Sequence, residues 1–328
     1  MVKPGIKIFF VLFIFTSLSM RGQQNNTLYF HHEIPQSSLL NPAIQDSCKI
    51  FIGLPVLSSI HFSLRNTAFS YNTIVRDGQI DPDYVLSRMH NIDYVFFEFH
   101  TNLLTVGYKY EDYYFTFNIA EKINFDFGFP KDLFSLAWDG NTQFIDKPAK
   151  LDRLGVNFTH LREYSISGSK KINKDLQVGT RAKLLFGKSQ VYNSRSKIRL
   201  AVDEDFYYLN LSSNLLINSS VPGLTLGSTI DDVSFDAGGL SPVSYLLNRK
   251  NWGMAFDFGG IYLNEDYNIK YHASITDLGY IRWKSDVNKI KQTNDFEYTG
   301  PQGQQITNYI NDIADSIVNM YLQNEEDH

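Results

Sequence analysis

The 328-residue chain contains one cysteine, Cys48, and has no excess of basic residues. A single cysteine cannot form an internal disulfide, and a zinc site needs several further ligands. We therefore expect Cys48 to be a small residue packed near the first strand. The formal net charge is −5 and no run of Lys or Arg forms a basic stripe, which excludes nucleic acid as a partner.

Long apolar runs are also scarce. The run from Ile8 to Leu18 follows two lysines and precedes a polar stretch, which is the layout of a secretory signal peptide. We predict that residues 1–22 are this peptide and that the mature chain begins near Gln23, with no cysteine there for a lipid anchor. No later stretch approaches the roughly 20 apolar residues of a membrane helix, so an exported chain that enters a membrane does so with strands.

Aromatic residues, in contrast, are abundant. The 25 Phe, 20 Tyr and 3 Trp make up 15% of the chain, which favours strands with an aromatic-rich exterior. Residues 103–120, 164–187 and 253–278 share one design, a strand, a short polar turn with Asp and a returning strand. Apolar and polar residues alternate along these strands, and a period of two gives each strand one apolar and one polar face.

Two all-β folds need such alternation. A soluble sandwich uses strands of about 5–6 residues, whereas a transmembrane barrel turns its apolar face to lipid and needs about 9–11. The strands here match the longer figure, with short turns at one end and long irregular segments, 188–196 and 219–249, at the other. We therefore predict an all-β fold, a transmembrane antiparallel β-barrel over residues 49–300, located in the outer membrane and in contact with its lipid.

Few helices are expected. Asp81-Pro82-Asp83 can cap a short helix through Met89, and residues 130–138 can form another. Residues 301–328 are predicted to be an amphipathic helix with a polar tail. We count nine or ten strands and no closing strand, although a barrel in lipid leaves no strand edge unpaired. We therefore expect the barrel to be incomplete at its C-terminus and the chain to be a truncated fragment.

Several motifs occur in a familiar order. Leu40-Asn41-Pro42-Ala43, just before the first strand, resembles the entry of FadL-type fatty-acid channels and of the PorV and PorP/SprF outer-membrane proteins of Bacteroidota. Residues 253–259 and 277–283 resemble an uncharacterised outer-membrane β-barrel family of that phylum, and the resemblance covers residues 23–325. It implies a barrel fold and an outer-membrane location but no substrate. A FadL-like barrel also implies a plug-like N-terminal segment, here residues 23–48.

The sequence lacks the usual catalytic motifs. Ser241 has no second glycine of a nucleophile elbow, and His160 with Glu163 lacks the spacing of a zinc hydrolase. The acidic stretch 203–205 has the oxygen ligands that a divalent cation prefers, but solvated acidic loops are more common. We therefore expect no enzyme activity, no catalytic residue, no metal site and no cofactor.

Arg181 and Lys183 are the candidate ligand-binding residues, because the alternation places both on the polar face that lines a barrel lumen. Pairing with acids on neighbouring strands is the alternative. The function we predict is a FadL-like channel for small hydrophobic solutes. The alternatives are a non-transporting scaffold or shuttle for protein partners in type IX secretion or gliding, and a soluble periplasmic β module that binds glycan or protein. An apolar lumen favours the channel, and a lumen crowded with charged residues contradicts it.

Overall fold

The computed structural model describes residues 34–55, 59–70, 74–76, 79–145, 147–203, 208–226, 233–235, 241–264 and 269–298. The predicted signal peptide and C-terminal helix, 1–22 and 301–328, lie outside these ranges. The helical pieces within them are short: η1 (Pro35–Leu39), α4 (Pro82–Arg88), α5 (Lys131–Asp139), η2 (Thr142–Phe144) and α6 (Pro242–Leu246). In the part of the chain that the structure describes, no helix is long and apolar enough to cross a membrane.

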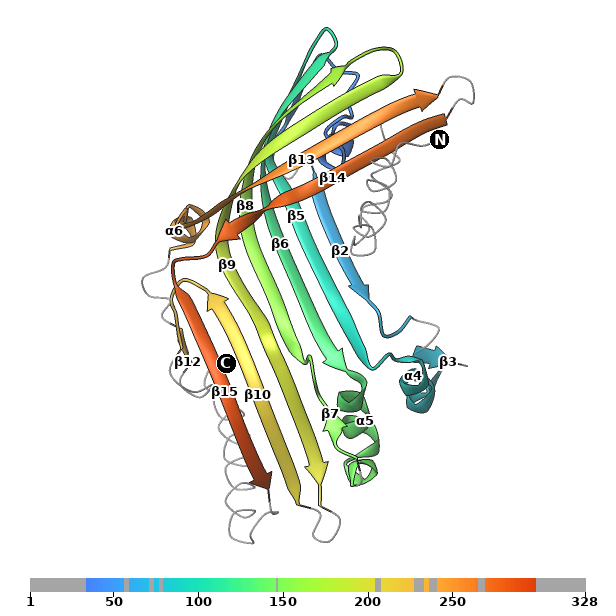
Figure 1. The fold of residues 1–328 in the computed structure, drawn as a ribbon, viewed down its shortest axis with the longest axis vertical. Helices are drawn as coiled ribbons and strands as arrows, with labels where there is room; N and C mark the ends of the chain where they lie inside the picture. The colour runs from blue at the N-terminus through green and yellow to red at the C-terminus, as the bar shows by residue number, and fades with distance from the viewer. Residues whose placement is uncertain are drawn as a thin grey trace, which may run out of the picture.

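One antiparallel sheet of 11 strands organises the molecule (Figure 1). Two further sheets have two strands each, β3 (Val75–Arg76) with β4 (Gln79–Ile80) and β11 (Leu224–Leu226) with β12 (Val233–Phe235). The strands of the large sheet are β1 (Ile50–Gly53), β2 (Ile60–Asn66), β5 (Ile92–Tyr110), β6 (Tyr113–Pro130), β7 (Ala149–Lys150), β8 (Gly155–Lys171), β9 (Leu176–Val202), β10 (Leu209–Ser220), β13 (Asn251–Asn264), β14 (Ile269–Arg282) and β15 (Val287–Tyr298).

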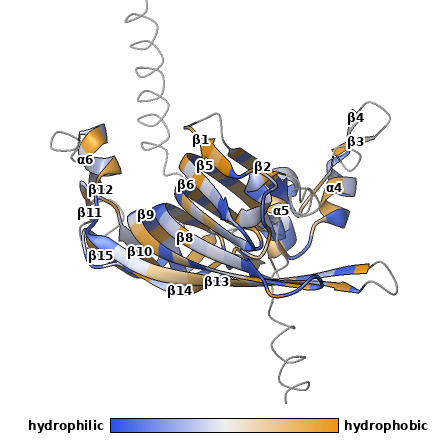
Figure 2. Cartoon of the chain, turned by 90° about the horizontal axis from the view of Figure 1, so that it is seen from above, coloured by the Kyte–Doolittle hydropathy of each residue, from blue (hydrophilic) through white to orange (hydrophobic). Residues whose placement is uncertain are grey.

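The prediction of an all-β, antiparallel fold is confirmed, and the described sheet is open. Its order is β1-β5-β6-β8-β9-β10-β15. In addition, β2 pairs with β5, β7 and β13 pair with β9, and β14 pairs with β13. Within the described ranges, β1 and β2 at one edge do not pair with β14 or β15 at the other. Seen from above, this sheet is curved, and hydrophobic and hydrophilic residues alternate along its strands (Figure 2).

The sheet divides at β9. Residues 176–187 of β9 pair with β13, whereas residues 190–202 pair with β10. Lys188 lies between these halves, where the register of β9 against β8 shifts. We call β13 and β14 the upper branch and β10 and β15 the lower branch, which diverge in Figure 1. The upper half of the molecule is the upper branch with the strand segments beside it, and the lower half is the lower branch with the strand segments beside it.

Several sequence predictions are confirmed and others are wrong. The helix capped by Asp81 is α4, and residues 130–138 overlap α5. Residues 188–196, predicted to be irregular, lie inside the 27-residue strand β9 because β8 and β10 pair with them on either side. Residues 219–249, also predicted to be irregular, contain β11, β12 and α6. Cys48 precedes β1, but it is exposed rather than packed.

Conventional apolar clusters are small and lie at the lower end. In one of them, Met89 and Phe129 are buried with α4 and α5 packed around them. In the other, Phe144, Ala149 and Val202 are buried beside the end of β9. The upper half of the sheet is organised differently, with its polar side chains buried and its apolar side chains exposed.

Candidate functional site

The two faces of the upper half differ in chemistry and in burial. We call the polar face the side whose buried members include Thr116, Ser167, Arg181 and Asp257, which lie in one row across β6, β8, β9 and β13. The apolar face is the opposite side, and its exposed members include Phe115, Phe117, Ile166, Val178, Leu184, Met254, Phe256, Phe258 and Leu278.

Arg181 and Lys183 lie on the polar face, as the alternation predicts, and they are only 2% and 5% exposed. Arg181 Nη1 lies 3.1 Å from Asp257 Oδ2, and Lys183 Nζ lies 2.8 Å from Asp257 Oδ1. Lys183 Nζ also lies 2.7 Å from Asp277 Oδ1. Both cations are thus paired with acids of the upper branch, Asp257 on β13 and Asp277 on β14, and such pairing is the alternative to a ligand-binding role.

Asp257 also determines the local course of the upper branch. The register between β13 and β14 shifts beside it, and Asp277 has a φ of 60° in the left-handed region. The Asp277 amide donates a hydrogen bond of 2.8 Å to Asp257 Oδ1. The same carboxylate thus pairs with two cations and stabilises the β-bulge at which the register of β13 and β14 shifts. Asp257 stands among small and apolar neighbours in the sequence, and that contrast is the feature that could have drawn attention to it.

A second ion pair on the polar face has no counterpart among the sequence predictions. Lys122 Nζ on β6 lies 2.7 Å from Glu163 Oε2 on β8, and Glu163 is 3% exposed. A cavity of about 570 Å³ lies beside this pair and is also lined by His100, Asn124 and Asp277. The residues that meet here come from six strands, so their spacing in the sequence carries no trace of the cluster.

The N-terminal segment, residues 35–46, lies against the polar face of the upper half. Arg181 donates from Nη1 to the Leu39 carbonyl at 2.9 Å and from Nη2 to the Ser38 carbonyl at 2.5 Å. Gln177 of β9 donates to the carbonyl of Ala43. Ala43 is fully buried. Arg181 therefore joins β9, β13 and the N-terminal segment.

Two glycines make room for the Asn41-Pro42 pair of the N-terminal segment. Gly179 on β9 and Gly259 on β13 face each other across the strand pair. A Cβ at Gly179 would collide with the Pro42 carbonyl, and a Cβ at Gly259 would collide with the Asn41 side chain. Asn41 is fully buried and lies 3.4 Å from the carbonyl oxygens of Gly260 and Ala273. Because these two glycines have no side chain, Asn41 and Pro42 can pack directly against the backbone of β9 and β13.

His160 and Glu163, which are close in the sequence, contact different partners. Glu163 pairs with Lys122 on the polar face, whereas His160 points to the other side, where its Nδ1 lies 2.8 Å from the Tyr245 hydroxyl of α6. Burial raises the pKa of the Tyr245 hydroxyl above its ordinary value of 10.0, so the hydroxyl stays protonated at neutral pH. Among the residues that the structure describes, no three His, Cys, Asp or Glu side chains gather as metal ligands.

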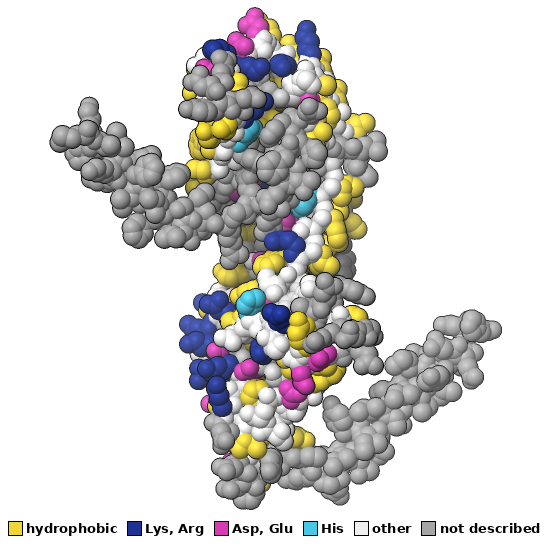
Figure 3. All heavy atoms as spheres, turned by 90° about the vertical axis from the view of Figure 1, so that its right-hand side faces the viewer, with side chains coloured by type: hydrophobic (Ala, Val, Ile, Leu, Met, Phe, Trp, Pro, Cys, Tyr) yellow, Lys and Arg dark blue, Asp and Glu magenta, His cyan; other side chains and the backbone are white. Residues whose placement is uncertain are grey.

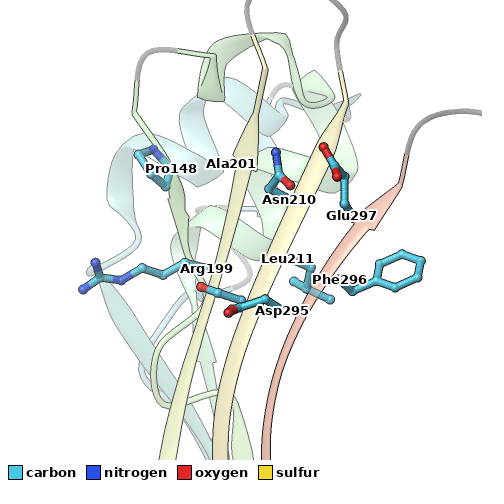
Figure 4. A pocket seen from close by; sticks show the side chains of 9 residues that line it. Pro148, Arg199, Ala201, Asn210, Leu211, Asp295, Phe296 and Glu297 are labelled. Atoms are coloured by element: carbon cyan, nitrogen blue, oxygen red, sulfur yellow. The ribbon is translucent and has the colours of Figure 1, made fainter.

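A further pocket, of about 480 Å³, lies between the lower ends of β9, β10 and β15. Arg199 and Phe296 at its sides point away from each other, as Figure 4 shows.

The model of one protein family, described as a family of unknown function (DUF5723), matches residues 42–328. No curated protein and no solved structure matches the chain.

Proposed function

The chain belongs to this family of unknown function, and we propose that it is an outer-membrane β-barrel protein that serves as a scaffold rather than as a channel. The observation that carries the proposal is the inverted burial of the upper half. Arg181 and Asp257 are 2% and 0% exposed, whereas Ile166 and Leu278 on the other face are 63% and 60% exposed. Proteins in water bury apolar rather than ionic side chains, and lipid reverses the preference for the outer face.

At least nine large apolar side chains are exposed on one face, and apolar patches of this kind mark contacts with a membrane or with another protein. Full burial of one side chain of this size contributes about 1.5–3 kcal/mol, so contact with lipid would stabilise the whole apolar face considerably. In the space-filling view, hydrophobic side chains lie along the right edge of the molecule, whereas Lys and Arg gather on the left edge of the lower half and again at the upper tip (Figure 3). Charged groups at the tip and an apolar surface below it support a membrane position for the upper half. Lipid also requires that every strand edge be paired, so the proposal includes closure of the open edges in the membrane.

Strand length supports a lower half that extends beyond the bilayer. β5, β6, β8 and β9 contain 19, 18, 17 and 27 residues, and a tilted strand crosses a membrane with about 9–11. In outer-membrane proteins the short turns face the periplasm and the long connections face outward. With the turns at 111–112 and 172–175 on the periplasmic side, α4, α5 and the lower branch would form the outer surface, available to secretion or surface proteins.

The chemistry of the polar face favours the scaffold over the FadL-like channel. A hydrophobic solute needs an apolar path, but the described polar face carries Arg181, Lys183, Asp257 and the Lys122–Glu163 pair. The N-terminal segment also covers part of this face, in the manner of a plug. The channel stays a prediction, and so does the soluble periplasmic module.

The membrane position is tested by matched Phe→Lys substitutions. We expect the wild-type protein to fractionate with the outer membrane and to shift on a gel when it is boiled. Phe256→Lys, on the apolar face, should reduce the membrane-inserted fraction severalfold, because a lysine facing mid-bilayer lipid costs about 2–4 kcal/mol. Phe296→Lys, at the lower end of β15, is the control: Phe296 is 59% exposed against 42% for Phe256, and the variant should insert like the wild type. Recovery of the wild type without detergent would contradict the membrane position and favour the periplasmic module.

Liposomes distinguish the scaffold from the channel. Vesicles that contain the purified protein should take up a fluorescent dodecanoic acid no faster than empty vesicles, because the polar face offers no apolar path. Uptake faster than that of empty vesicles would establish the channel instead, if Asp257→Asn or removal of residues 35–46 changes the rate of uptake.

A further inference from the structure

The lower half of the polar face contains a trough of about 870 Å³ that runs across β5, β6, β8 and β9. Its volume exceeds that of the cavity beside Lys122 and Glu163. Its central row is Phe96, Asp126, Asn157 and Tyr192, which face one another in the strand registers. Neighbouring strands are about 4.8 Å apart, so the two aromatic ends of the row are separated by about 14 Å. This volume and length suit a ligand of several ring-sized units.

Aromatic rings form part of the floor of the trough. Tyr94 and Phe96 stack with their ring centroids 5.8 Å apart and their planes at 22°. The Tyr94 ring lies over Gly128, where an added Cβ would be 3.0 Å from its Cε1 atom. Arg65 covers Phe96 at 5.0 Å, whereas Tyr192 at the opposite end is 39% exposed. Phe96 is thus covered by Arg65, which leaves Tyr94 and Tyr192 as the other two aromatic rings that line the trough.

The polar groups around these rings both donate and accept hydrogen bonds. Asn157 Nδ2 donates to Asp126 Oδ2 at 3.2 Å, and Arg153, Gln190 and Arg195 line the same trough. Two guanidinium groups and one carboxylate line the trough, so neutral and weakly acidic ligands both find hydrogen-bond partners here. The trough also shares Gln190 and Tyr192 with the cavity beside Lys122 and Glu163, and thus extends toward the upper half.

This combination selects a ligand class. The hydrocarbon chain of a fatty acid would remove water from the charged and amide groups of the trough and offer them no hydrogen bond in return, which is costly. A peptide strand would need an unpaired strand edge, but β6, β8 and β9 are paired on both sides here. Sugars present hydroxyls that donate and accept, and their C–H faces pack on aromatic rings. We propose that the trough binds an oligosaccharide of neutral or weakly acidic sugars, with Tyr94 and Tyr192 as stacking platforms and Asp126, Asn157 and Arg195 as hydrogen-bonding groups.

The inference rests on the proposed function in one respect, because glycans outside the membrane reach the lower half only if it extends beyond the bilayer. Binding itself can be measured on the purified protein, wherever the protein is located. We would measure it by titration calorimetry in a detergent without a sugar headgroup, because maltoside detergents would compete for the site. The probes are maltohexaose, chitohexaose and mannohexaose as neutral chains and hexamannuronate as an acidic chain.

At least one probe should bind the wild type, and Tyr192→Ala should weaken it about tenfold through the loss of a stacking platform. Tyr192→Phe keeps the ring and should stay within about threefold of the wild type. Tyr110→Ala, an exposed tyrosine on the apolar face near the turn of β5, is the matched control and should bind like the wild type. Heat modifiability of each variant shows that its fold is retained.

Two results would overturn the inference: no binding of any of the four probes by folded wild-type protein, or equal binding by the wild type and Tyr192→Ala. Neither result touches the membrane position, which the fractionation of Phe256→Lys tests separately. Conversely, a protein that binds a probe but fractionates as soluble would overturn the proposed location and leave the trough as a glycan site.

Discussion

Asp257 is the residue on which the polar face of the upper half depends. It is fully buried and accepts contacts from Arg181, from Lys183 and from the backbone amide of Asp277. Buried ion pairs contribute little net stability, but the loss of one partner leaves a buried charge uncompensated. The two cations make this loss severe, because both share the same carboxylate.

Asp257→Asn should therefore lower the free energy of unfolding by about 3–5 kcal/mol, measured by urea titration in micelles with tryptophan fluorescence. Asp277→Asn is the matched control. The side chain of Asp277 is 63% exposed, and solvent-screened pairs contribute about 0–1 kcal/mol. Equal losses for the two variants would show that Asp257 has no special place in the network.

At the scale of elements, the N-terminal segment is held by backbone contacts that only glycine permits. Alanine usually stabilises a strand slightly relative to glycine, since it restricts the unfolded chain. At Gly179 and Gly259 this gain is outweighed, because the added methyl group would occupy the position of Pro42 or Asn41. The same change at Gly260 meets nothing closer than 4.0 Å.

Gly179→Ala and Gly259→Ala should release the N-terminal segment from the sheet. We expect hydrogen exchange of residues 35–46 to become at least about tenfold faster, which corresponds to a local loss of about 1.4 kcal/mol. Gly260→Ala, on the same strand, should leave the exchange unchanged. Unchanged exchange in all three variants would mean that the segment is held by other contacts.

At the scale of the whole molecule, the two branches of the sheet meet at Asn251. This residue begins β13 and is fully buried. Its Nδ2 donates to Ser220 Oγ at the end of β10, at 3.1 Å. Its Oδ1 accepts the backbone amides of Lys284 and Ser285 between β14 and β15, at 2.8 and 2.9 Å. One side chain thus ties the upper branch to the lower branch.

Asn251→Ala should loosen the two branches from each other, because two backbone amides lose their acceptor and each unsatisfied buried group costs about 1–3 kcal/mol. Hydrogen exchange should accelerate in residues 284–290 and at the end of β10 while the centre of β9 stays protected. Asn210→Ala, an exposed position on β10, is the control. Acceleration spread evenly over the sheet would indicate that the branches form one cooperative unit.

Much of the local structure was predictable from the sequence, because strand alternation and turn chemistry act between near neighbours. The side on which Arg181 and Lys183 lie follows from the alternate directions of successive Cβ atoms. The turn at 111–112 and the Asp81 cap of α4 likewise depend on a few adjacent residues, with Glu111 at a φ of 53°.

The partners of those residues were decided only by the tertiary structure. Arg181 meets Asp257 across 76 positions of the chain, and Asn41 reaches the Gly260 carbonyl across 219. The course of β9 through residues 188–196, the division into two branches and the trough on the polar face likewise depend on which strands become neighbours. A period of two determines the face of each residue, but strand order and register arise from contacts between distant segments, which no local pattern encodes.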